Sequence, residues 1–297
     1  MHVREDLRVA VVVTAVGTGL GFASGRTQAV FCAQTARTSW LGAVFSALVF
    51  GLLTAMLCHL KRRTGAQRFP GVYRRLLGCH AGKLIGGLYA AALIVAAVLL
   101  LSATAKIGAL VLPLRHGALT GALTALLLSG IVAALGDGAL ACVGGAYLAL
   151  LLMLELALWR FGGRPDPARL QFVVDLQLAD SVAGALILGA LCACMSTALS
   201  AGVVVRMAGG RSSPCGVGLF CVLLYLLVQL TGNAALQRQQ QEVLSLRTPF
   251  VALTALWGKL GFYLSAGLIF LGATTALTGV LRAFMPVKSD RRDFYGC

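Results

Sequence analysis

Eight long apolar stretches dominate this chain of 297 residues, and they constrain its fold more than any other feature. A helix needs roughly 20 apolar residues to cross about 30 Å of hydrocarbon. With 59% hydrophobic and 12% charged residues, the chain is too apolar for a soluble enzyme or a disordered polypeptide. The pattern predicts an all-α polytopic membrane protein. We expect spans at residues 8–34, 40–60, 84–113, 116–135, 138–159, 180–207, 214–236 and 250–284.

The net charge of +15 indicates membrane topology rather than nucleic-acid binding, because the basic residues collect in short segments between the spans. With a cytoplasmic amino terminus, 15 of the 25 lysines and arginines fall on the inner side and 7 outside. The other three, Arg26, Lys106 and Lys259, fall within the membrane. This bias predicts that both termini are cytoplasmic, including a tail at 285–297. The connection at 61–83 is either a topology anchor or a surface for anionic lipid.

The first span contains the strongest local signal. Four glycines lie within residues 17–25, and the polar residues Arg26, Thr27 and Gln28 follow at membrane depth. Each glycine weakens a helix by roughly 1 kcal/mol relative to alanine, and an arginine at this depth costs at least about 2.5 kcal/mol. One interpretation is a smooth packing face, because glycines recur every four residues; another is a signal peptide. We favour a broken helix, whose unwound peptide groups face a cavity and bind a solute or an ion.

The run GTGLGFASGRTQAVF at 17–31 resembles the first-helix signature of the YkvI family of bacterial membrane proteins. The segments LSATAKIGALV at 101–111 and GATTALTGVL at 272–281 resemble other parts of that family. It belongs to the amino acid, polyamine and organocation transporter superfamily, which has the LeuT-type fold. The resemblance therefore implies a bacterial cytoplasmic membrane and one LeuT-like transmembrane domain over 1–297, with a discontinuous first helix.

The resemblance further implies a first repeat at 8–159 and an incomplete second repeat at 180–284. It would place a second broken helix in the sixth span, where no glycine cluster marks one. Two features depart from the family: Thr27 stands where an acidic residue is expected, and the chain has eight helices where the fold has ten. A homo-oligomer or a partner chain that supplies the missing helices would complete the fold.

These considerations together define a candidate site at the first-span break. Its predicted substrate-binding residues are Gly21, Phe22, Ala23, Ser24, Gly25, Arg26, Lys106, Ser196 and Thr197. Glu155 is the expected partner of Lys106, and a lysine that reaches the membrane surface is the alternative. The resemblance also implies a sodium ion, bound by backbone oxygens of Gly19 and Phe22 and by the hydroxyls of Thr274 and Thr275. Alternatively, these threonines only bond to a carbonyl one turn earlier.

We therefore expect a secondary transporter, coupled to sodium or protons, for a small organic solute such as an amino acid. The rival hypothesis is a non-transporting membrane sensor or assembly component. FASG at 22–25 does not match the motif of an intramembrane serine protease, so we expect no enzymatic activity and no cofactor beyond sodium.

Overall fold

The described part of the chain is helical and contains eight helices that are long and apolar enough to cross a membrane. A computed structural model describes residues 2–31, 38–66, 69–111, 116–161, 182–209, 212–237 and 248–285. The eight long helices are α1 (His2–Ala23), α3 (Ser39–Thr64), α5 (Cys79–Val111), α6 (Gly117–Leu135), α7 (Asp137–Phe161), α9 (Val182–Met207), α10 (Pro214–Gln237) and α13 (Lys259–Phe284). The prediction of eight spans is confirmed. Shorter helices are α2 (Arg26–Phe31), α4 (Phe69–Leu77) and α12 (Pro249–Ala255).

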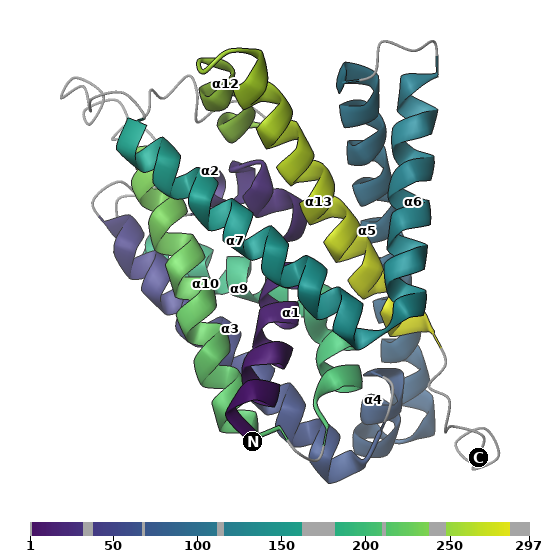
Figure 1. The fold of residues 1–297 in the computed structure, drawn as a ribbon. Helices are drawn as coiled ribbons and strands as arrows, with labels where there is room; N and C mark the ends of the chain where they lie inside the picture. The colour runs from purple at the N-terminus through teal and green to yellow at the C-terminus, as the bar shows by residue number, and fades with distance from the viewer. Residues whose placement is uncertain are drawn as a thin grey trace.

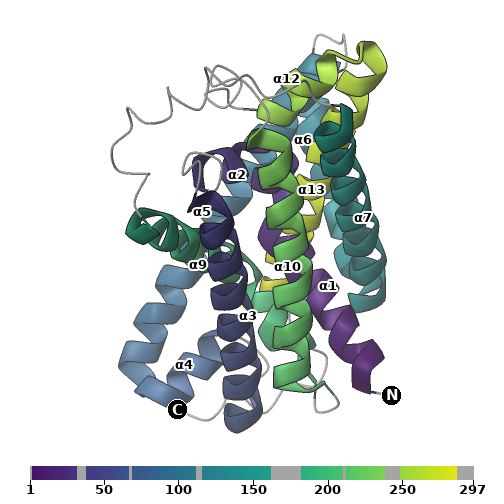
Figure 2. The same ribbon diagram turned by 90° about the vertical axis from the view of Figure 1, so that its left-hand side faces the viewer.

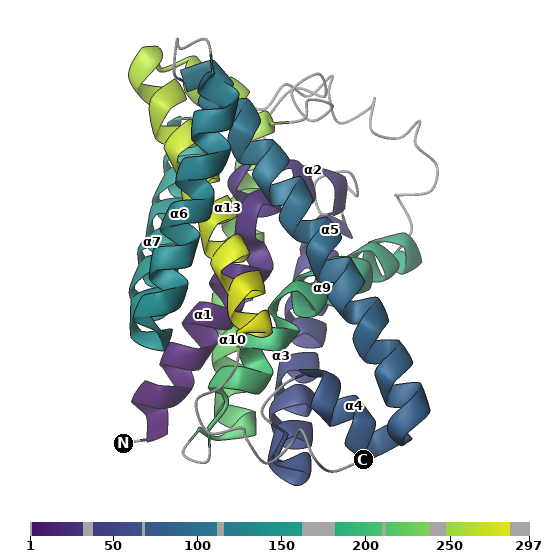
Figure 3. The same cartoon turned by 90° about the vertical axis from the view of Figure 1, so that its right-hand side faces the viewer.

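The long helices form two groups that meet at α1. Helix α3 packs against both α9 and α10, and α9 and α10 each pack against α1, whereas α5 and α6 form a hairpin that packs on α13. Helix α1 also packs along α13 and α7. It begins, and α13 ends, at the same end of the bundle, where α4 also lies (Figure 1). Figure 2 shows α3, α9 and α10 from the side, and in Figure 3 α5 runs obliquely across the bundle.

Small residues let these helices approach closely. At the contact of α3 with α9, a Cβ added to Gly42 would lie 2.9 Å from the Ala185 carbonyl oxygen. At the contact of α5 with α6, a Cβ on Gly108 would lie 2.7 Å from the Cα of Gly121. Within a bilayer, helices gain stability mainly from such close packing, because lipid tails are as apolar as the side chains themselves.

Large apolar side chains lie on the outside of the bundle as well as in its interior. Leu84, Leu88, Val95 and Val98 of α5 are all exposed in the isolated chain. A soluble monomer rarely exposes such a continuous apolar surface. The outward face of α5 therefore suits contact with lipid, which agrees with a polytopic membrane protein.

Two predicted segments differ in the structure. The expected span at 250–284 is divided, because the chain turns after α12 and Gly258 takes a φ of 83° that disfavours other residues. The basic connection at 61–83 contains α4, whose Phe69 and Val72 are buried against α9. These two side chains therefore contact protein, not the lipid leaflet, whereas Leu76 and Leu77 remain exposed.

Candidate functional site

Helix α1 is interrupted at Gly19, near the middle of the bundle. Gly19 has φ 39° and ψ −140°, which lies outside the helical region. Residues with a Cβ atom strongly disfavour this conformation. Its carbonyl oxygen accepts a hydrogen bond of 2.6 Å from the hydroxyl of Tyr147 in α7. Tyr147 is fully buried, and its hydroxyl supplies a donor to a carbonyl group that the non-helical angles of Gly19 turn away from the helical direction.

A second interruption at Ser24 and Gly25 separates α1 from α2. Gly25 has φ 75°, and the Ser24 carbonyl accepts a 3.2 Å hydrogen bond from the backbone of Phe250, at the start of α12. The Ser24 hydroxyl donates to the Gly21 carbonyl over 3.0 Å and accepts from the Arg26 amide over 3.3 Å. The discontinuity predicted in the first span is therefore present, and the Tyr147 side chain of α7 and the Phe250 backbone of α12 each bond to one carbonyl group of this segment.

The close-packing interpretation also describes part of this segment. A Cβ on Gly17 would lie 3.0 Å from the Ser196 carbonyl oxygen and 3.3 Å from the Phe50 ring. No positive φ occurs at Gly17 or Gly21. The two interpretations thus apply to different glycines: Gly19 and Gly25 allow the interruptions, whereas Gly17 allows close contact with α9 and α3.

A buried cluster of aromatic and polar side chains lies beside the interruption. We call Phe22, Phe50, Ser196 and Tyr225 the Tyr225 cluster. Tyr225 stacks on Phe50 at 4.3 Å between ring centroids and meets Phe22 edge to face at 5.5 Å. Its hydroxyl lies 2.9 Å from the Ser196 hydroxyl. The cluster joins α1, α3, α9 and α10, and it includes two of the predicted substrate-binding residues, Phe22 and Ser196.

Phe50 and Tyr225 were not predicted from the sequence. A usable signal exists in α10, where Tyr225, Gln229 and Asn233 recur every four residues in an otherwise apolar span. Such spacing places polar groups on one helix face. Gln229 extends the cluster, because its amide nitrogen lies 3.4 Å from the sulfur of Cys192, which in turn lies 3.3 Å from the Tyr225 hydroxyl.

The predicted sodium ligands are only partly brought together. A Cβ on Gly272 of α13 would lie 3.0 Å from the Gly19 carbonyl oxygen, so α13 meets α1 at its interruption. Thr275 is three residues beyond Gly272 and lies about 60° from it around the helix, whereas Thr274 lies about 160° from Gly272. The hydroxyls of Thr274 and Thr275 both donate to the Leu271 carbonyl, which is the alternative considered from the sequence. The Phe22 carbonyl accepts from the Gly25 amide over 2.9 Å.

This donor set suits sodium only in part. The carbonyl of Gly19 and the hydroxyl of Thr275 offer oxygen lone pairs, as a hard cation requires, and Thr275 is one turn from Gly272, which meets Gly19. Thr274 does not share their face, so a site built from all four predicted ligands does not fit this arrangement. The sodium ion stays a prediction that depends on Gly19 and Thr275.

The other predicted substrate-binding residues are distributed differently. Ala23 is buried, and Arg26 is half-buried at the start of α2. Thr197 donates to the Ala193 carbonyl of its own helix over 2.8 Å. Lys106 lies on the exposed surface of α5, which places it outside the Tyr225 cluster. Helix α9 continues without interruption from Val182 to Met207, so the second broken helix implied by the resemblance is not seen there.

The expected pairing of Lys106 with Glu155 is wrong. Glu155 of α7 is completely buried, and its carboxyl group accepts a 2.7 Å hydrogen bond from the side-chain amide of Gln28 in α2. Its other oxygen contacts the hydroxyl of Thr231 in α10. The prediction was wrong because Lys106 lies on the exposed face of α5, whereas Glu155 is buried. Sequence spacing does not reveal which face of α5 is exposed.

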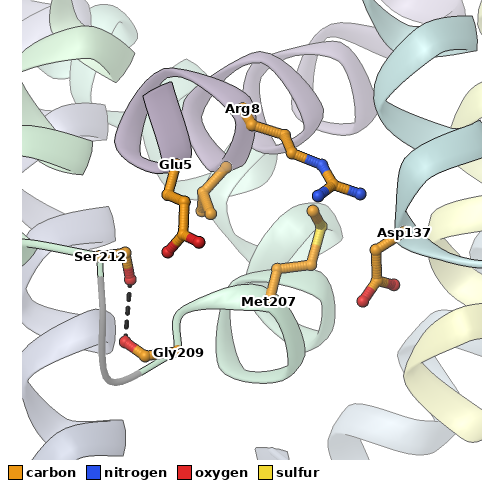
Figure 4. Close-up of a pocket in the computed structure, with 7 residues that line it drawn as sticks. Glu5, Arg8, Asp137, Met207, Gly209 and Ser212 are labelled. Atoms are coloured by element: carbon orange, nitrogen blue, oxygen red, sulfur yellow. Dashed lines mark hydrogen bonds between the residues drawn. The ribbon is translucent and has the colours of Figure 1, made fainter. Parts of the chain in front are cut away.

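A polar cavity of about 340 Å³ lies at the end of the bundle where α1 begins. Its lining includes Glu5, Arg8, Asp137, Met207 and Ser212, and in Figure 4 Arg8 extends toward Asp137. Arg8 is 11 residues before Gly19, which is roughly 16 Å along a helix. The cavity is therefore separate from the Tyr225 cluster.

Ion pairs tie helix ends together beside this cavity. Asp137, the first residue of α7, pairs with Arg282 of α13 and lies 4.0 Å from Arg206 of α9. Arg282 also donates to the Ala133 carbonyl of α6 over 2.9 Å. One carboxylate thus links helices from both groups at this end of the protein.

Compared with models of known protein families and with curated protein sequences, the chain matches none of them significantly. The resemblance of its first span to the YkvI family therefore remains an expectation. The fold and the composition establish a coarser statement: the chain is a polytopic helical membrane protein with eight candidate spans.

Proposed function

We propose that the protein is a secondary transporter of a small organic solute, such as an amino acid, driven by a sodium or proton gradient. The observation that carries the proposal is the double interruption of the first span, at Gly19 and at Ser24–Gly25, inside the bundle. Irregular backbone at membrane depth is tolerated where it is enclosed by protein or lines a cavity. Transporters use such interruptions to expose peptide groups to a solute.

The arrangement of the helices supports this proposal. Near its interruption α1 contacts α9 at Gly17 and α13 at Gly19, so it lies between the two helix groups. Rocking of one group against the other would act at this segment, which is how LeuT-like transporters alternate access. The continuous α9 departs from that fold, so the proposal rests on α1 and its neighbours.

The Tyr225 cluster suggests the kind of solute. It combines aromatic faces with the hydroxyls of Ser196 and Tyr225, and none of its members is charged. Aromatic faces bind apolar groups, and paired hydroxyls can exchange their mutual hydrogen bond for bonds to a ligand. These properties favour a solute with an apolar body and no net charge, such as a zwitterionic amino acid.

The test is uptake of radiolabelled amino acids by proteoliposomes under imposed sodium or proton gradients. We expect Tyr225→Phe to lower uptake about 3- to 10-fold, because it removes a hydroxyl worth roughly 1 kcal/mol. The matched control is Tyr89→Phe. Tyr89 also makes hydrogen bonds, to Ala198 and Gly202 at the contact of α5 with α9, but it lies outside the cluster.

Equal losses of uptake in the two variants would separate the Tyr225 cluster from solute binding. If the wild-type protein accumulates no amino acid under either gradient, and none of them raises its thermal stability, the transporter proposal fails. That result would favour a membrane sensor or assembly component.

A further inference from the structure

Glu155 is a buried acid that the proposed solute site does not use. Its side chain contacts α2 through Gln28 and α10 through Thr231. Within the described residues, no lysine or arginine nitrogen lies within 4 Å of the carboxyl group. An ionised carboxylate without a cation is expensive to bury, even when hydrogen bonds offset part of the cost.

The hydrogen atoms around Glu155 are too few to satisfy every contact of an ionised carboxylate. The amide nitrogen of Gln28 has two hydrogens, which it donates to Glu155 and, over 3.0 Å, to the Val228 carbonyl. The Thr231 hydroxyl has one hydrogen but two close acceptors, because it contacts the second Glu155 oxygen and lies 2.8 Å from the Leu227 carbonyl. A carboxylate would leave one of these two contacts without a hydrogen.

One added proton completes the set. If the second oxygen of Glu155 is protonated, it donates to the Thr231 hydroxyl, and Thr231 donates its own hydrogen to Leu227. The first oxygen still accepts from Gln28. Each of these contacts is then a normal hydrogen bond, and the buried carboxyl group is neutral.

We propose that Glu155 is a proton-binding site whose occupancy is linked to the docking of α2 against α7 and α10. Gln28 is the only described side chain through which α2 bonds to this acid, and its own carbonyl oxygen is buried without a donor. That oxygen can accept a hydrogen bond from a proton donor arriving at Glu155. Movement of α2 would withdraw Gln28 and change the affinity of Glu155 for the proton.

In the described part of the chain, few other charged or titratable groups lie near Glu155 that could bind the proton in its place. Helix α10 contributes no charged residue, and no ion pair between described residues involves Glu155. The titratable neighbour on α7 is Tyr147, which is two turns away and bonds to Gly19. The Gln28 amide packs directly against Gly232 of α10, where an added Cβ would overlap it.

Infrared difference spectroscopy of the purified full-length protein tests the site without knowledge of a solute. We expect a protonated-carboxyl band at neutral pH that disappears in Glu155→Gln. It should shift in frequency in Thr231→Val, because that variant removes the acceptor, and in Gly232→Ala, because that variant displaces Gln28. Glu5→Gln, which removes a carboxyl group from the end cavity, should leave the band unchanged.

If the wild-type protein and Glu155→Gln have the same infrared spectrum in the region of the protonated-carboxyl band, the inference is overturned. A sodium site instead of a proton site would be indicated if sodium raises the thermal stability of the wild-type protein but not of Glu155→Gln, with no protonated band. The use of this proton in transport rests on the proposed function. Failure of all solute uptake would refute that function, while the infrared band alone decides the proton site.

Discussion

Replacing Gly19 with alanine tests the backbone interruption most directly. At φ 39° and ψ −140° a side chain is strained, which typically costs about 1–3 kcal/mol. The new Cβ would also lie 3.0 Å from the Cβ of Ala276 in α13. The matched control is Gly130→Ala in α6, where an added Cβ meets no atom within 4 Å and should stabilise the helix by about 0.4–1 kcal/mol. We therefore expect the two variants to differ by about 1.4–4 kcal/mol.

The assay is reversible unfolding in mixed micelles, followed by tryptophan fluorescence, with the free energy of unfolding compared between variants. Adding Ala276→Gly to Gly19→Ala removes the side-chain contact but not the backbone strain. Most of the loss should therefore persist in the double variant. Equal stability of Gly19→Ala and Gly130→Ala would refute the reasoning, because it would mean that residue 19 does not hold this conformation.

Two further substitutions test contacts between helices by the same unfolding assay. Tyr147→Phe leaves the buried Gly19 carbonyl without its donor and should lower the free energy of unfolding by about 1–3 kcal/mol. The control Tyr263→Phe, at an exposed position of α13, should leave it unchanged. Similar values for both variants would contradict the assigned bond. Asp137→Ala leaves Arg282 without its carboxylate and should cost ~1–3 kcal/mol, less than a fully buried pair because the Asp137 side chain is 37% exposed. An unchanged free energy of unfolding would show that the Asp137–Arg282 pair does not hold the helix ends together.

Much of the architecture could be predicted from local sequence. Apolar length determines whether a helix can cross the bilayer, and each stretch carries that property by itself. The interruption of the first span was also predictable, because only glycine adopts the backbone angles at Gly19 and Gly25 without strain. Gly258 carries the same local signal for the division of the span at 250–284, although the length of that stretch suggested one helix.

The partners of these groups depend on packing between distant segments. Gly19 bonds to Tyr147, and Gln28 of α2 bonds to Glu155, across separations of more than 120 residues. Lys106 illustrates the same limit, because sequence spacing did not reveal that it lies on the exposed face of α5.

The sequence by itself determined the eight apolar spans and the glycines at which the first span is interrupted, because both are properties of short segments. Only the tertiary structure decided that Tyr147 satisfies the freed carbonyl, that Tyr225 meets Phe22 and Phe50, and that a buried acid holds α2. The physical reason is that apolar side chains define a helix without specifying which neighbour each face contacts. That choice follows from the fit of whole helices against one another, set by small residues and by polar groups that must find partners inside the bundle.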